Sequence, residues 1–210
     1  LLAFGLASGL PAGGSAVASA GRDMKALVAR DPLFLSAAVL FGAAGPLGTA
    51  VLVGVASRDE LGLSGTAAGV VLLVGSSVPI VVTPFWGRIV DRVGSRRSAT
   101  LGLIATSVVT SALVFGTSPV RLGLLWALGS VGVGVTIVSI QSLAATLSST
   151  NRGGVISFTL AFRFTGLALA PVIWLPVFDR SPTAAFVGAA LLGIPAVVLM
   201  ARVKRGAIAA

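Results

Sequence analysis

The sequence predicts an all-α membrane protein, a bundle of six transmembrane helices. Two observations lead to this fold class: 56% of the 210 residues are hydrophobic and only 10% are charged, and long apolar stretches alternate with short charged ones. A soluble domain is about 45–50% apolar even when glycine is counted. Lipid offers no hydrogen-bond partners, so each apolar stretch is expected to pair its own backbone as a helix.

The spans follow from reading the apolar runs between charged residues, at about 20 residues for each crossing. They are expected at 33–56, 66–86, 98–116, 120–147, 154–178 and 183–201. Short connections make consecutive spans antiparallel and gather residues 33–205 into one bundle. Ser64 and Asn151 precede the second and fifth spans. We expect their side chains to cap these helices by accepting hydrogen bonds from free amides.

The segments outside the spans are interpreted from their charge. Residues 1–20 are apolar and are expected to be the tail of a preceding membrane helix. The alternative is the remnant of a signal peptide, because Ala18-Ser19-Ala20 is similar to a cleavage site. The basic segment 21–32 is expected to be a cytoplasmic linker, and residues 206–210 a cytoplasmic tail.

Basic residues collect on one side of this topology. One set of alternate loops holds Arg22, Lys25, Arg30, Arg88, Arg92, Arg96, Arg97, Arg152, Arg202, Lys204 and Arg205, whereas the opposite set holds Arg58, Arg121 and Arg180. Lysine and arginine favour the cytoplasmic side of a membrane. Both ends of the six-span domain are therefore expected in the cytoplasm, with the protein in the cell membrane.

The composition also limits the chemistry. The sequence has no cysteine and no histidine, and its six acidic residues fall in loops or at the ends of spans. Groups for acid–base or nucleophilic catalysis are therefore missing at membrane depth, and we expect no enzyme, catalytic residue, cofactor or metal site. The formal net charge of +9 comes from clusters at span ends, which a membrane topology explains better than nucleic-acid binding.

The most informative charged cluster joins the second and third spans, and residues 87–97 are expected to form a tight cytoplasmic loop. Its two glycines would permit the turn. Its aspartate could accept hydrogen bonds at the N-terminus of a facing helix, or pair with a nearby arginine. One interpretation is a conformational switch, and the alternative is a topology anchor at anionic headgroups. The candidate switch residues are Gly87, Asp91, Arg92, Gly94, Arg96 and Arg97.

This arrangement resembles the signature loop of the major facilitator superfamily, which follows the second helix in each six-helix half of these transporters. The matching positions are Gly87, Ile89, Asp91, Arg92, Gly94, Arg96 and Arg97. Ser95 departs from a residue that is often basic. Segments 60–69 and 163–171 also look like parts of the family's helices. The resemblance covers about residues 31–205 and implies one half of that fold.

The resemblance favours the C-terminal half. In the N-terminal half of the family an arginine usually stands in the fourth helix ahead of a glycine-rich run, but here Leu125 fills that place before Gly129. The apolar start and the basic segment 21–32 fit a sixth helix and central loop that lead into the seventh helix.

Arg163 stands out within the fifth span. It follows Arg152 by eleven residues, or about 16 Å along a helix, which places it close to the middle of the bilayer. An arginine at that depth costs about 2.5–3.5 kcal/mol on insertion scales, so it needs a water-filled cavity or a partner. It could bind an anionic substrate group or a carboxylate of the missing half, or instead be a structural arginine bonded to carbonyls near Gly166 and Pro171.

The remaining substrate-binding candidates are polar residues of the fourth span, namely Gln141, Thr136 and Ser139. Hydrogen bonding between helices is the alternative role for such residues. The resemblance implies a secondary active transporter of small solutes that works by alternating access. Its partners would be a small-molecule substrate, the lipid bilayer and the other six-helix half. The alternative is a non-transporting membrane scaffold or a truncated remnant of a transporter.

Overall fold

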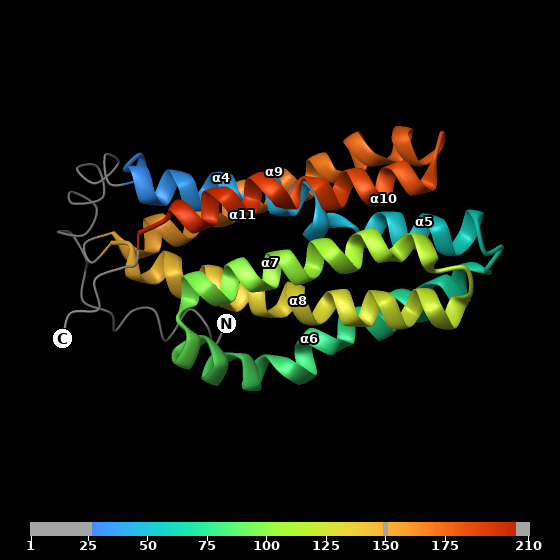
Figure 1. Cartoon of the computed structure of the whole chain (residues 1–210), viewed down its shortest axis with the longest axis horizontal. Helices are drawn as coiled ribbons and strands as arrows, with labels where there is room; N and C mark the ends of the chain where they lie inside the picture. The colour runs from blue at the N-terminus through green and yellow to red at the C-terminus, as the bar shows by residue number, and fades with distance from the viewer. Residues whose placement is uncertain (1–26, 149–150, 205–210) are drawn as a thin grey trace, which may run out of the picture.

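A computed structural model describes residues 27–148 and 151–204, which form an elongated bundle of helices (Figure 1). The helices are α4 (Arg30–Ala44), α5 (Ala50–Asp59), α6 (Gly65–Val93), α7 (Ser95–Ala112), α8 (Pro119–Thr146), α9 (Arg152–Phe178), α10 (Pro182–Leu191) and α11 (Gly193–Arg202), with 3₁₀ turns η1 (Pro46–Gly48) and η2 (Leu113–Phe115). This confirms the all-α class for the described residues. The expectations for residues 1–20 and 206–210, and for most of 21–32, lie outside them.

Five helices of the described chain are long and apolar enough to cross a membrane: α6, α7 with η2, α8, α9, and α10 with α11. Four of them begin and end close to the expected limits, whereas α6 continues beyond residue 86 to Val93. Both predicted caps are confirmed. The side chain of Ser64 accepts a hydrogen bond from the amide of Ala67 at 3.3 Å, and that of Asn151 from the amide of Gly154 at 3.0 Å.

The expected span 33–56 is not one continuous helix. The chain leaves α4 after Ala44 and passes through η1 before α5 begins, and the two helices follow one another along the bundle (Figure 1). Pro46 lacks an N–H and cannot continue the helical pairing. The amide of Gly48 donates to the carbonyl of Gly45 at 3.0 Å. The carbonyl of Ala44 instead accepts a hydrogen bond from the indole of Trp174 on α9, at 2.6 Å.

Glycine and threonine bring α7 and α8 close together. A Cβ at Gly102 would meet the hydroxyl of Thr136, and a Cβ at Gly132 would meet the hydroxyl of Thr106. Each threonine donates to the glycine carbonyl one turn before it, at 2.8 Å. Small residues permit close contact between membrane helices, so this reciprocal arrangement ties α7 to α8 at the centre of the bundle.

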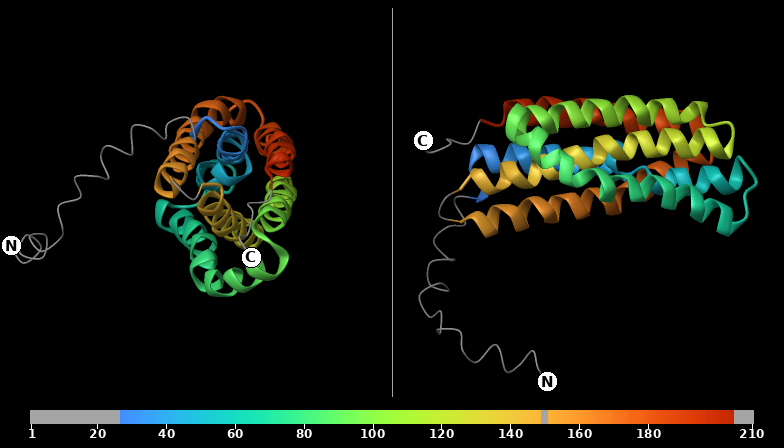
Figure 2. Two further views of the ribbon diagram at one scale, coloured as in Figure 1. Left: turned by 90° about the vertical axis from the view of Figure 1, so that its left-hand side faces the viewer. Right: turned by 90° about the horizontal axis from the view of Figure 1, so that it is seen from below.

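Helices α6 and α9 are the least covered of the membrane-length helices. Only 17% of the residues in the apolar window of each are buried, compared with 50% in α8. Both helices pack on α8. In the view along the bundle they lie on one side of α8, while α7 and α11 lie on the other (Figure 2). The bundle therefore has one side on which two long apolar helices are largely uncovered.

Candidate functional site

The charged cluster after the second expected span lies at a junction between two helices. The prediction that residues 87–97 form a loop is therefore wrong. Residues up to Val93 belong to α6, Gly94 alone breaks the chain, and α7 begins at Ser95. Val90, in the last turn of α6, is packed inside the bundle and only 3% exposed. Gly94 has φ +92°, which favours glycine. Gly87 lies inside α6 and takes no part in a turn.

A groove of about 410 Å³ surrounds this break. Residues 90–97 form one part of its lining, and Ser142, Leu143 and Thr146 of α8 form the other. The hydroxyls of Ser95 and Ser142 lie 2.9 Å apart and join the start of α7 to α8. The groove is therefore built between three helices, and the arginines of the cluster lie around it.

Arg96 holds the chain that follows α11. Its Nη1 donates to the carbonyl of Val203 at 3.1 Å and to that of Ala201 at 3.4 Å. The amide of Lys204 donates to a carboxylate oxygen of Asp31 at 3.3 Å. The peptide group between Val203 and Lys204 is thus held by α7 on one side and by α4 on the other. A cation beside the last carbonyls of a helix also complements the helix dipole.

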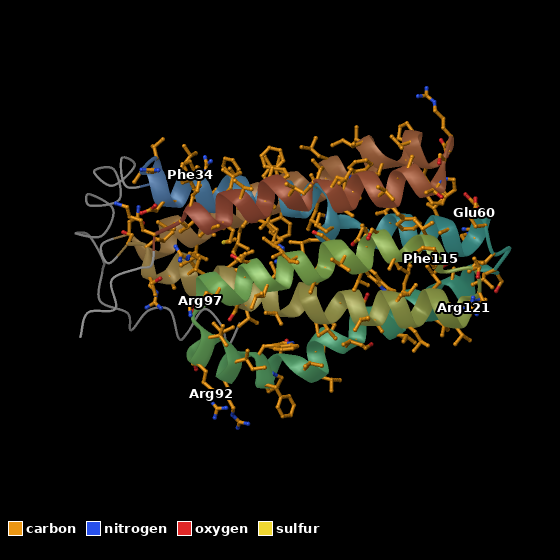
Figure 3. All side chains as sticks on the ribbon, in the orientation of Figure 1. Phe34, Glu60, Arg92, Arg97, Phe115 and Arg121 are labelled. Carbon is orange, nitrogen blue, oxygen red and sulfur yellow. The ribbon has the colours of Figure 1, made fainter. Side chains whose placement is uncertain are left out.

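The other charged residues of the cluster are exposed. Asp91, Arg92 and Arg97 make no hydrogen bond or ion pair with any residue that the structure describes. The expected pairing of Asp91 with a neighbouring arginine is therefore not formed. Figure 3 shows Arg92 and Arg97 at one end of the bundle, far from Arg121 at the opposite end.

Arg163 is half-buried near the middle of α9 and has no hydrogen-bond or ion-pair partner within residues 27–148 and 151–204. It lies four residues after Thr159 and three before Gly166, two residues that pack on α4. The hydroxyls of Thr159 and Ser36 are 3.5 Å apart, and a Cβ at Gly166 would meet the carbonyl of Leu40. The helical spacing therefore places Arg163 at the edge of the α4–α9 contact.

The three polar candidates of α8 have different surroundings. Thr136 is buried in the contact with α7 described above, and Ser139 is buried with no hydrogen-bond partner among the described residues. Gln141 is exposed. It lies seven residues after Gly134, which contacts Pro79 of α6. Helix α6 diverges from α8 toward the C-terminal end of α6 (Figure 1).

Several contacts at the site were not anticipated from the sequence. The hydroxyl pair across α7 and α8 and the contact of Arg96 with the chain after α11 join residues far apart in the chain, and no local pattern signals either. The indole N–H of Trp86 is buried against Gly134 without a partner in the described chain. No group of three or more His, Cys, Asp or Glu that could hold a metal is found among the described residues.

Comparisons with known proteins agree with the resemblance. The family model described as Major Facilitator Superfamily matches residues 33–207. The chain is 31% identical over 157 residues to YaaU of Escherichia coli (strain K12), provisionally named a metabolite transport protein, covering 67% of this chain and 33% of that protein. It is 29% identical over 132 residues to the uncharacterized MFS-type transporter YwoD of Bacillus subtilis (strain 168), covering 61% of this chain and 29% of that protein. The matches thus span about a third of each relative.

Proposed function

The chain belongs to the Major Facilitator Superfamily, and we propose that it forms one half of a secondary active transporter that moves a small solute by alternating access. It is a multi-pass membrane protein, on the strength of its family and its five membrane-length helices. In this proposal α4 and α5 together make a further pass, which gives six. Both ends of the domain then lie on the cytoplasmic side of the cell membrane, and the chain corresponds to the C-terminal half of the transporter.

The observation that carries this proposal is the uncovered side formed by α6 and α9. Both helices carry large exposed apolar residues, including Ile80 at 76% on α6 and Val172 at 70% on α9. Substrate sites of many transporters lie near the bilayer midplane between two structural repeats. A second six-helix half placed against this side would complete such a site.

Arg163 is proposed to anchor an anionic group of the substrate, or a carboxylate of the other half. Two observations support this role. Arg163 has no partner among the described residues, and its expected position is close to mid-bilayer, where an unpaired guanidinium is costly. Gln141 is proposed as a hydrogen-bonding residue of the same pathway because its side chain is exposed. Thr136 and Ser139 are buried and are proposed only as supporting residues.

The residues around Gly94 are proposed to act as the conformational switch. Asp91 is exposed and unpaired within the described chain, so its carboxylate is free to accept hydrogen bonds from a helix N-terminus of the other half in one access state. Arg92 and Arg97 are free to pair across the same contact. Breaking these contacts in the second state would bias the equilibrium between the two.

Transport by the full-length protein in sealed vesicles tests the proposal. A panel of anionic and neutral solutes is offered to the wild type and to Arg163→Ala, Arg163→Lys and Arg152→Ala. Arg152 is exposed in the first turn of the same helix and serves as the control. We expect Arg163→Ala to lower anion transport by roughly tenfold or more, since a hydrogen bond to a charged group contributes about 1.5–3 kcal/mol. Transport by Arg163→Ala at the wild-type rate would contradict the role assigned to Arg163. If the wild-type protein transported no solute, the alternative of a non-transporting membrane scaffold would be favoured.

A further inference from the structure

We propose that the groove at the α6–α7 break binds a phosphate group with a charge of about −2, presented by a phosphomonoester lipid headgroup such as that of phosphatidic acid or by a soluble phosphate. The groove has a volume of about 410 Å³ and is lined by Arg92, Arg96 and Arg97. This binding is a property of the chain itself and does not require that the protein transports a solute.

The charge of the lining fits a phosphate monoester. The lining contains three arginines and a single carboxylate, that of Asp91. A phosphate monoester carries a charge of about −1.5 to −2 at pH 7, which balances this excess. Arginine suits the ligand in shape as well, because its planar fork donates two parallel hydrogen bonds to phosphate oxygens.

The backbone at the start of α7 adds further donors. This helix of 18 residues has no side-chain cap, and its first paired amide is that of Ser98, which donates to the carbonyl of Gly94 at 3.0 Å. The amides of Ser95, Arg96 and Arg97 therefore lack partners in the described chain, and all three residues line the groove. Free amides at the start of a helix attract anions through their hydrogen bonds and the helix dipole.

The groove is held in shape before any ligand arrives. The contact between the Ser95 and Ser142 hydroxyls fixes α7 against α8, and the bond from Arg96 to the carbonyl of Val203 fixes it against the end of α11. Arg96 is thus a fixed residue of the groove lining. Arg92 and Arg97 are exposed and extend from the two sides of the break (Figure 3), so they are free to close on a bound phosphate.

Binding to the full chain in phosphatidylcholine nanodiscs tests this proposal. One arm measures retention of radiolabelled inorganic phosphate, and the other counts phosphatidic acid molecules held per chain when that lipid is added to the nanodiscs. The test variant is Arg92→Gln with Arg97→Gln. The control is Arg121→Gln, which removes an exposed arginine at the opposite end of the bundle (Figure 3). The substituted side chains are exposed, so we expect wild-type circular dichroism from both proteins.

We expect the double variant to weaken binding by roughly tenfold or more, since each charge-assisted hydrogen bond is about twice as strong as a neutral one. The control should bind like the wild type. Retention of phosphatidic acid alone would identify a lipid headgroup, retention of inorganic phosphate alone a soluble ligand, and retention of both would show that the phosphate group suffices. The proposal is overturned if the wild type retains neither ligand, or if the double variant and the control bind equally well.

Discussion

The hydrogen bond from Trp174 to the break between α4 and α5 should contribute measurably to stability. The carbonyl of Ala44 has lost its helical donor, because the amide of Gly48 donates to Gly45 instead. The indole of Trp174 replaces that donor at 2.6 Å. Leaving a buried acceptor without a partner costs about 1–3 kcal/mol, whereas hydrogen bonds between membrane helices average about 0.6 kcal/mol and reach about 1.7 kcal/mol. We therefore expect a loss of about 1–1.5 kcal/mol when this N–H is removed.

The measurement replaces the indole by its benzothiophene analogue, which keeps the ring shape and lacks the N–H. Trp126 is the matched control, since its indole donates to the carbonyl of Leu72 at 3.3 Å. That carbonyl lies inside continuous α6, where a helical N–H already pairs with it. The free energy of unfolding is measured in mixed detergent and dodecyl sulfate micelles. An equal or larger loss at Trp126 would show that the carbonyl of Ala44 does not depend on the Trp174 N–H in this way.

Two further substitutions test the structure around Gly94. Gly94→Ala should destabilise the protein by about 1–3 kcal/mol, because a side chain is strained at φ +92°. Gly87→Ala, in the interior of α6, should be neutral or stabilising by up to about 1 kcal/mol. The measurement is thermal unfolding in detergent, and equal melting temperatures of the two variants would contradict this prediction. Arg96→Ala should speed tryptic cleavage at Lys204, because the peptide before it loses the bond from Nη1, while Arg97→Ala should leave that cleavage rate unchanged. Equal cleavage rates would contradict the role assigned to Arg96.

The helices and their caps could be predicted because their signals are local. An apolar run fixes a span, and a polar residue such as Ser64 or Asn151 directly before it marks the first turn. The break in the first span could not be predicted in this way, since Pro79 and Pro171 lie inside continuous helices. What distinguishes the break is the packing around it, where a Cβ at Gly48 would meet Ala43 and Ala170.

The charged cluster shows the same division between local and distant causes. Its residues can be identified from the sequence, but the continuation of α6 to Val93, with Val90 buried against other helices, cannot. The role of Arg96 depends on where α11 ends, and that segment is more than one hundred residues away in the chain.

We expect a second half of the transporter to cover the side formed by α6 and α9. Photo-crosslinking amino acids placed at Ile80, Val172 and Val108 of the full-length protein would detect this contact. All three positions are more than 60% exposed in the chain alone, and Val108 lies on α7. We expect crosslinks to the rest of the protein from Ile80 and Val172, and only lipid adducts from Val108. Protein crosslinks from Val108 with none from the other two positions would contradict it.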